Sequence, residues 1–511
     1  MNPDPVTPDP RADSLAARVA DRGETALARL AELRAPDPPT TGGRVLSYVY
    51  DSGVEGLDDV AIRAAALAHG VNGLDPTVFG SVADVHGGIV RRAREILGGD
   101  DEVFGSVTSG GTESCVLACL AAREVAGRAP GEGGTIVAPV TVHAAFRKAA
   151  HLLGLRFVGV EVDPASARVS AQELLAAVDH DTVLVVCSAP AYPTGVVDPV
   201  AEVAAGLEVR GADHVGLHVD ACLGGLVLPF WPDGPGVPAL EPWDLRLPRV
   251  TSVSADLHKY GFAPKGSSVL LSRGRARHRA AWFATVDWPG YPVVNPTLLG
   301  SKPLEPAAAA WAVLEALGDD GQRELVARTA RATDRLAVGI EALEGLRLLD
   351  RDPGPLLAVV TDDAAPEARR VHPHLWADAC GRHGIAVQCQ PAYRQERGAV
   401  PSSAHLTITP VTERLVEEIL AVAGEAADEV RGRPAPEAPA EFADILGALE
   451  SGALSPADLL ALPEDDVHAL VSAVVSGDSE PGMAGLFAAI ERLPTDVGAR
   501  LVRAYLAAVM E

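Results

Sequence analysis

Long apolar runs are missing from this chain of 511 residues. No segment approaches the roughly eighteen uncharged apolar residues of a membrane-spanning helix, so we expect no membrane span. The first residues, MNPDPVTPDPRAD, also lack the basic segment followed by an apolar run that marks a secretory signal. These two absences predict a cytoplasmic protein.

Positive charge is scarce as well. The chain has 43 lysines and arginines against 69 aspartates and glutamates, a formal net charge of −26. Nucleic acids and anionic membranes are bound by basic surfaces, so neither is an expected partner. The acidic balance is most simply a means of keeping the protein in solution, and basic residues gathered in a cleft would still admit an anionic substrate.

Cysteine is the third scarce residue. The chain has six cysteines and no CxxC pair, which in a large protein that is not secreted indicates free buried thiols. Cys115 and Cys119 lie one helical turn apart, but two ligands do not make a metal site. We therefore expect no metal and no disulfide framework.

Short apolar runs alternate with helical segments from about residue 84 onward. Strands interleaved with helices indicate βαβ units and a mainly parallel sheet. Six runs have the length and composition of strands in this region, at 135–140, 156–162, 182–189, 214–221, 250–255 and 267–272.

The rest of the chain is mostly helical in pattern. Helices are predicted over about 14–34, 305–344 and 412–430, with strands at 356–361 and 405–410. The last residues, 436–511, hold thirteen acidic and three basic residues and predict short helices, one of them capped by Ser455 before Pro456. We expect four parts: an arm and segment contributing to a dimer active site (1–83), a large domain (84–305), a small α+β domain (306–430), and a linker with an acidic helical tail (431–511).

A glycine-rich turn, SGGTES at 109–114, precedes a predicted helix over 115–125. Backbone N–H groups at a helix N-terminus, approached through glycines, form a cradle for phosphate, and Thr112 adds a hydroxyl group. A glycine-rich turn without a ligand is more common, so this motif is weak when it stands alone.

Two side chains then follow predicted strands. His143, in VTVHAAFRKAA, could stack on an aromatic ring, although a helix-capping or core histidine is the commoner case. Asp220, in HVDACLGG, stands at the carboxyl end of an apolar strand, where open α/β sheets bind ligands. Its carboxylate could pair with a protonated pyridine nitrogen, or it could cap a helix.

Lys259, in SVSADLHKYGFAPKG, follows a strand of small and apolar residues. Burial should lower the pKa of its amine and favour the neutral form that makes an imine. A lysine considered alone is usually structural or solvated. However, features for phosphate, ring, ring nitrogen and imine occur here in order, and together they predict a pyridoxal-phosphate (PLP) site with Lys259 as the Schiff-base residue.

The motifs VTSGGTES, HAAFRKAA, SAPAYPTGVVDPV, LHVDACLGG and SADLHKYGFAPKGSS resemble sphingosine-phosphate lyase, within the group II PLP-dependent decarboxylase superfamily. The likeness covers about residues 43–430, and more weakly GMAGLFAAIERLP and AYLAAV near the end. It implies a PLP-dependent transferase-like fold (fold type I), in which a large domain with a mainly parallel sheet joins a small α+β domain. It also implies a homodimer with shared active sites.

The resemblance implies roles for the cofactor residues. Lys259 would hold PLP covalently, Asp220 would pair with the pyridine nitrogen, and His143 would stack on the ring. The phosphate would be bound by Gly111, Thr112 and His258.

The resemblance also implies roles on the substrate side. Lys265 would meet the substrate's phosphate, and Asn72 would be an active-site asparagine. Tyr50, in GRVLSYVYD, would reach in from the partner subunit.

The departures from the family pattern fall in these substrate-side segments. Tyr48 replaces a small residue, Asp75 replaces a histidine, and Lys302 stands where the family has an arginine. The run at 290–293 also differs from the family's. The cofactor segments are intact, so the departures predict retained chemistry and a changed substrate.

The expected function is therefore carbon–carbon cleavage of a β-hydroxy amine or its phosphate to an aldehyde and a shorter amine. The alternatives are amino-acid decarboxylation and a non-catalytic paralogue that acts through its tail. Lys265 and Lys302 could receive a phosphate or carboxylate, whereas Asp75 would repel one or hold a substrate amine. Long-chain sphingoid phosphates are expected to be poor substrates, and a smaller amine or amino acid is preferred.

Overall fold

The computed structural model describes residues 10–232, 239–475 and 482–511, and the chain divides into two compact units, Met1–Thr40 and Thr41–Glu511. The first unit contains helix α1 (Pro10–Arg34), which confirms the helix predicted over 14–34. Its apolar residues recur at helical spacing, yet Leu15, Leu27 and Leu33 are each more than half exposed. The helix is thus amphipathic, with its apolar stripe on the surface of this unit.

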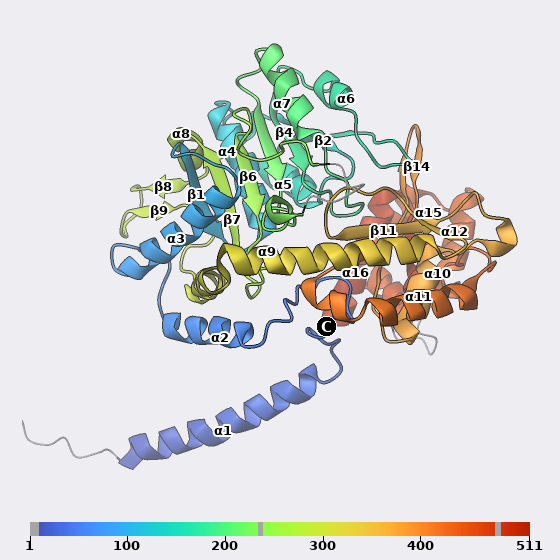
Figure 1. Cartoon of the computed structure of the whole chain (residues 1–511), viewed down its shortest axis with the longest axis horizontal. Coiled ribbons are helices and arrows are strands. Elements are labelled where there is room, and N and C mark those ends of the chain that lie inside the picture. The colour runs from blue at the N-terminus through green and yellow to red at the C-terminus, as the bar shows by residue number, and fades with distance from the viewer. Residues whose placement is uncertain (1–9, 233–238, 476–481) are drawn as a thin grey trace, which may run out of the picture. The chain divides into compact units, whose positions relative to one another are not determined.

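A seven-stranded sheet is the centre of the second unit (Figure 1). All its strands run parallel except β7, which lies antiparallel to both of its neighbours. Every residue of β2, β4, β5 and β6 is buried, as expected of strands covered on both faces. In spatial order the strands are β1 (Val103–Thr108), β7 (Ser268–Arg273), β6 (Ser252–Ala255), β5 (Gly216–Asp220), β4 (Thr182–Ser188), β2 (Thr135–Pro139) and β3 (Arg156–Val160).

The six strands predicted in this region are confirmed, and β1 was missed. Gly105 and Ser106 interrupt the apolar run of β1, so its sequence does not show a strand pattern. The helices that accompany this sheet along the chain are α2 (Leu57–Ala68), α3 (Gly80–Ile96), α4 (Gly111–Val125), α5 (Ala145–Leu153), α6 (Ala171–Ala176), α7 (Val200–Val209) and α8 (Arg275–Ala280).

Helix α9 (Glu305–Glu341) leads from the large sheet toward a smaller antiparallel sheet (Figure 1). It bends at Gly318, whose backbone is non-helical. The smaller sheet has the order β10 (Leu346–Leu348), β11 (Leu356–Thr361), β15 (Ser403–Thr407), β12 (Gln388–Gln390). Helix α10 (Pro373–Arg382) packs on it, and α11 (Val416–Val430) packs on α10 and α9 and shares the same apolar core. The strand expected at 405–410 lies at 403–407, because Pro410 begins a 3-10 turn, η3 (Pro410–Arg414). Two hairpins complete the strands, β8 (Phe283–Thr285) with β9 (Val293–Asn295) and β13 (Tyr393–Gln395) with β14 (Gly398–Val400).

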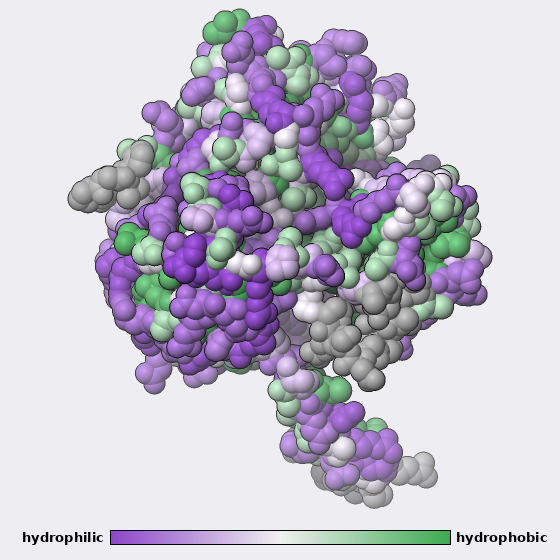
Figure 2. Space-filling view, turned by 90° about the vertical axis from the view of Figure 1, so that its right-hand side faces the viewer, coloured by the Kyte–Doolittle hydropathy of each residue, from purple (hydrophilic) through white to green (hydrophobic). Residues whose placement is uncertain are grey.

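The C-terminal tail folds into short helices, as predicted. They are α12 (Ala440–Glu450), α13 (Pro456–Leu460), α14 (Glu464–Val475), α15 (Met483–Arg492) and α16 (Thr495–Met510). They have an apolar core of their own that includes Phe442, Leu446 and Leu501. Ser455 caps α13 as expected, since its hydroxyl accepts a hydrogen bond from the Asp458 N–H at 3.2 Å. The side of the molecule seen in Figure 2 is mostly hydrophilic, with small apolar patches.

Three further expectations concern the whole chain. All six cysteines are buried free thiols, as predicted. Among the described helices, none combines the length and apolar character that crossing a membrane requires. The division at residues 83, 305 and 430 stays a prediction.

Candidate active site

A cavity of about 370 Å³ lies at the carboxyl ends of β4, β5 and β6. This is the edge at which open α/β sheets bind ligands. The structure brings together here every residue that the sequence assigned to the cofactor. The cavity is lined by Gly111, Thr112, His143, Asp220, His258 and Lys259.

Lys259 follows β6 in a tight turn, and its side chain is 20% exposed. Its Nζ atom lies 3.0 Å from Oδ2 of Asp256. Burial lowers the pKa of Lys259, but Asp256 and other groups of the cavity raise it more, and the pKa lies above its ordinary value. The prediction of a lowered pKa and a neutral amine was therefore wrong, because it took account of burial and left out the carboxylate three residues earlier.

Asp220 ends β5 and is buried. Its Oδ1 atom accepts hydrogen bonds from the Cys222 N–H at 3.1 Å and from the Ser254 hydroxyl at 3.4 Å. Burial raises the pKa of Asp220, whereas the nearby His143 and Lys259 lower it, and the net shift is downward. Asp220 is thus an ionised carboxylate at the cavity floor, and turns rather than an α-helix follow it.

His143 lies just before α5, with its ring at the cavity. Its Nδ1 atom accepts a hydrogen bond from the Ala145 N–H at 3.2 Å. The side chain thus satisfies the N–H of the first residue of α5, whose N-cap is Ala144, and the ring also faces the cavity. This hydrogen bond helps to orient the ring.

The N-terminus of α4 forms one wall of the cavity and carries no side-chain cap. The first N–H groups of a helix have no partners within it, so they are available to an anion. A Cβ atom at Gly111 would lie 2.7 Å from Asp256 Oδ1 and 2.8 Å from Cys222 Sγ, so only glycine fits there. The glycine thus lets the helix start close to Asp256 and Cys222, and the free N–H groups of the helix start suit a phosphate group.

Asp256 is a residue of the cavity that the sequence reasoning missed. Its Oδ2 atom lies 3.0 Å from Lys259 Nζ and 3.5 Å from His258 Nε2, while Oδ1 is buried without a hydrogen-bond partner among the described residues. The signal was present in SADLHK, where an acidic residue precedes the lysine by three positions. Cys115, Asp220 and Cys222 also converge here, within 4.8 Å of one another, which spacing along the chain could not show.

Lys265 and Tyr50 meet beside the cavity. The Lys265 Nζ atom lies 4.5 Å from the centroid of the Tyr50 ring, which packs edge-on against Tyr260 at 5.4 Å. Burial raises the pKa of Tyr50 and the charge of Lys259 partly lowers it, so the phenol lies near the lysine of its own chain. Its entry into the active site of a partner subunit stays a prediction.

The other predicted substrate residues are not brought to the cofactor cavity within one chain. Asn72 accepts a hydrogen bond from the Leu74 N–H at 3.0 Å and holds a turn. Lys302 Nζ donates to Thr297 Oγ1 at 3.0 Å and lines two other cavities, of about 470 and 60 Å³, the smaller of which shares Ser109 and Glu113 with the cofactor cavity. Asp75 is exposed, and its Oδ1 atom accepts from the N–H and hydroxyl of Thr77. Tyr48 is 65% exposed.

Residues 82–343 match the family model described as the pyridoxal-dependent decarboxylase conserved domain. The chain belongs to this family. Pyridoxal phosphate is accordingly its cofactor, and fold type I is its fold. Both expectations from the sequence are confirmed.

Curated proteins that are similar to this chain in sequence include several sphingosine-1-phosphate lyases. The lyase of Dictyostelium discoideum is 38% identical over 57% of this chain and 54% of its own length. That of Arabidopsis thaliana is 30% identical over 77% of this chain and 70% of its own. The chain thus spans little more than half the length of the slime-mould enzyme.

Solved structures of PLP-dependent enzymes also resemble this chain in fold. A sphingosine-1-phosphate lyase from Burkholderia pseudomallei superposes with a TM-score of 0.70 at 29% identity, covering 88% of this chain and 97% of that one. A glutamate decarboxylase from Lactobacillus brevis has a TM-score of 0.68 at 19% identity, covering 84% of this chain and 95% of that one, and shows the shared fold alone.

Proposed function

We propose that this protein is a PLP-dependent carbon–carbon lyase that cleaves a β-hydroxy amine, or its phosphate, to an aldehyde and a shorter amine. One observation carries the proposal. A single cavity holds Lys259, Asp220, His143 and the α4 N-terminus, in a chain similar to sphingosine-1-phosphate lyases. The intact set argues against a non-catalytic paralogue.

Bound PLP would supply an electron sink for the bonds at the substrate's α-carbon. Lys259 would hold the cofactor through its Nζ atom, which Asp256 orients from 3.0 Å. Asp220, ionised and buried, would keep a proton on the ring nitrogen. The ring of His143, fixed by its bond to Ala145, would lie against the cofactor ring.

The phosphate of the cofactor would lie at the N-terminus of α4. Gly111 begins this helix, and Thr112 and His258 line the same cavity. Glu113 does not block this wall, because its carboxylate accepts hydrogen bonds from Ser109 and from the Leu298 N–H at 2.7 Å. Those hydrogen bonds hold the Glu113 carboxylate in place beside the helix N-terminus at which the phosphate would bind.

An anionic group of the substrate would be met by Lys265. Burial and the charge of Lys259 lower the pKa of Lys265 to about 8. The amine is protonated at neutral pH and can bind a phosphate or a carboxylate. The second candidate function, decarboxylation of an amino acid, is favoured by the family as a whole.

The protein would act as a homodimer. The β8–β9 hairpin and its surroundings expose large apolar residues, including Phe283 at 60%, Val286 at 81% and Tyr291 at 60%. Exposed apolar clusters of this kind usually mark an interface. Val286→Asp should lower the mass measured by light scattering to that of one chain. Val209→Asp, at a position 89% exposed on α7, is the matched control and should not. A wild-type protein with the mass of one chain contradicts the dimer.

Product analysis tests the reaction. The purified protein, loaded with PLP, is given a 2-amino-3-hydroxyalkyl phosphate and, separately, a panel of amino acids. Release of an aldehyde from the first supports the lyase, whereas release of CO₂ from an amino acid without aldehyde from the first supports the decarboxylase. A protein that stays colourless after PLP is added, with neither product formed, overturns both.

A further inference from the structure

The cavity of about 470 Å³ lies along β1, the edge strand of the large sheet, and residues 103–107 of that strand line it. It shares no lining residue with the cofactor cavity. One wall is a face of α3, where the lining positions 86, 90 and 94 recur one helical turn apart. Another comes from residues that follow β7, including His278, Trp282 and Thr297. The cavity is therefore separate from the PLP site.

The ionisable side chains that line this cavity are all basic: His86, Arg91, Arg94, His278 and Lys302. No carboxylate of the described chain lines it, although acidic residues outnumber lysines and arginines by 69 to 43 in the sequence. Burial and the charge of Lys302 lower the pKa of His86 to about 4. Burial and two neighbouring arginines lower the pKa of His278 likewise, to about 4. Both imidazoles are thus neutral at neutral pH, and the positive charge comes from the two arginines and Lys302.

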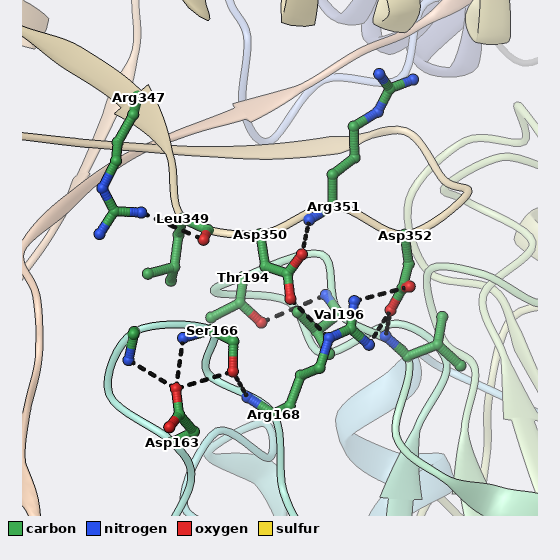
Figure 3. A network of polar contacts seen from close by, with 12 residues as sticks. Asp163, Ser166, Arg168, Thr194, Val196, Arg347, Leu349, Asp350, Arg351 and Asp352 are labelled. Carbon is green, nitrogen blue, oxygen red and sulfur yellow. Dashed lines mark hydrogen bonds and ion pairs between the residues drawn. The ribbon is translucent and has the colours of Figure 1, made fainter. Parts of the chain in front are cut away.

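The protein itself hardly neutralises the two arginines. The Arg91 guanidinium makes no hydrogen bond or ion pair with any residue that the structure describes. Arg94 lies 3.5 Å from Asp101, whose side chain is 99% exposed, so water screens that pair. Arg168, elsewhere in the same unit, shows the contrasting arrangement, since it binds the carboxylates of two aspartates at 2.6 and 2.9 Å (Figure 3). The cavity thus retains positive charge that a bound anion could neutralise.

The open edge of β1 adds backbone donors to the cavity. Among the described strands, β1 pairs with β7 alone. The Gly274 N–H donates to the Glu102 carbonyl oxygen at 2.8 Å, so the even-numbered residues of β1 exchange hydrogen bonds with β7 in this antiparallel register. The N–H groups of Gly105 and Val107 therefore face the open edge, and both residues line the cavity. Such N–H groups can donate hydrogen bonds to the oxygen atoms of an anion.

We infer that this cavity binds a ligand that carries two or three linked phosphate groups. Its three cationic side chains match that number of negative charges, and arginine forms paired hydrogen bonds with phosphate oxygen atoms. The neutral imidazoles and the N–H groups of the β1 edge would bind further oxygen atoms. The ligand is distinct from substrate and cofactor, because no residue of the PLP site lines this cavity. The inference therefore holds whichever reaction the PLP site catalyses.

Titration calorimetry of the PLP-loaded protein with inorganic pyrophosphate, at constant ionic strength, tests the inference. Bound PLP occupies the phosphate cradle of the cofactor cavity, so the probe cannot bind there. The wild-type protein should bind pyrophosphate more tightly than inorganic phosphate. Arg91→Gln should weaken pyrophosphate binding about fivefold, the upper end for an exposed charge pair. Arg63→Gln is the matched control, because Arg63 is also an exposed arginine on a helix but lies outside the cavity, and it should leave binding unchanged.

Three outcomes overturn the inference. The first is a wild-type protein that binds pyrophosphate no more tightly than phosphate, or binds neither. The second is an equal loss of affinity in Arg91→Gln and Arg63→Gln, which would show a general effect of net charge. The third is a loss in Lys265→Gln but not in Arg91→Gln, which would place the probe beside the cofactor. Circular dichroism checks that each variant is folded, and the visible absorption band checks that PLP remains bound during the titration.

Discussion

The cofactor cavity and an apolar cavity of about 420 Å³, which share His143 and Tyr192, differ in how the chain builds them. The cofactor cavity is charged, and most of its charged and glycine-rich motifs follow the ends of β1, β2, β5 and β6: 109–113, His143, Asp220, and Asp256 with His258 and Lys259. The apolar cavity takes side chains from segments as distant as Val140, Leu349 and Phe487. The difference shows that the cofactor site is encoded in local motifs, whereas the apolar cavity depends on how distant segments meet.

The largest effect is expected at the floor of the charged cavity. Asp220→Ala removes the carboxylate that would keep the ring nitrogen protonated, and turnover should fall roughly 10²–10³-fold, the scale for losing one preorganised electrostatic partner. Some cofactor should remain bound, since Lys259 and the α4 N-terminus are untouched. Steady-state kinetics and the visible spectrum measure the two effects. Near wild-type turnover would show that a different residue faces the nitrogen.

The next effect concerns pH at the entrance to the same cavity. The pKa of Lys265 is lowered to about 8, so its positive charge is present below that pH and lost above it. With an anionic substrate, kcat/KM should fall up to about tenfold for each pH unit above 8 as this one proton is lost.

Lys265→Arg is the matched variant for this pH effect, because a guanidinium remains charged throughout. It should shift the alkaline decline to higher pH. An unchanged pH profile in this variant would mean that another group is responsible.

A smaller effect, on the free energy of unfolding, is expected at Tyr192, which lines both cavities. Tyr192→Phe removes the hydroxyl that donates to Gln388 and leaves the amide oxygen without that partner. The free energy of unfolding should fall by about 1 kcal/mol, the usual net value of one hydrogen bond. Urea denaturation measures it. A loss well beyond this value would show that Tyr192 also supports the walls by packing.

The smallest effect is expected where the sequence departs from the family. Asp75 is exposed, so its charge is screened by water, and Tyr48 is 65% exposed. Replacing both, as Asp75→His with Tyr48→Ala, should raise kcat/KM for a sphingoid phosphate roughly 1.5- to 5-fold, the range for exposed charge pairs. No gain, with efficient wild-type cleavage of that substrate, would show that neither residue limits the substrate.

The sequence could predict most of the large sheet, because continuous apolar runs such as residues 182–188 mark strands buried on both faces. It could not predict the pKa of Lys259, which depends on a distance of 3.0 Å to Asp256 rather than on burial alone. Nor could it place Phe487 at a cavity beside His143, because the contact depends on how α15 packs against α10 and β12.

Trapping the cofactor tests the central claim most directly. The yellow holoenzyme is reduced with borohydride, digested, and its peptides are sequenced by mass spectrometry. The account predicts a phosphopyridoxyl group on the peptide that contains Lys259, and none on Lys265 or Lys302. It predicts no labelled peptide from Lys259→Ala. A label on another lysine, or none on the wild-type protein after loading with PLP, would contradict it.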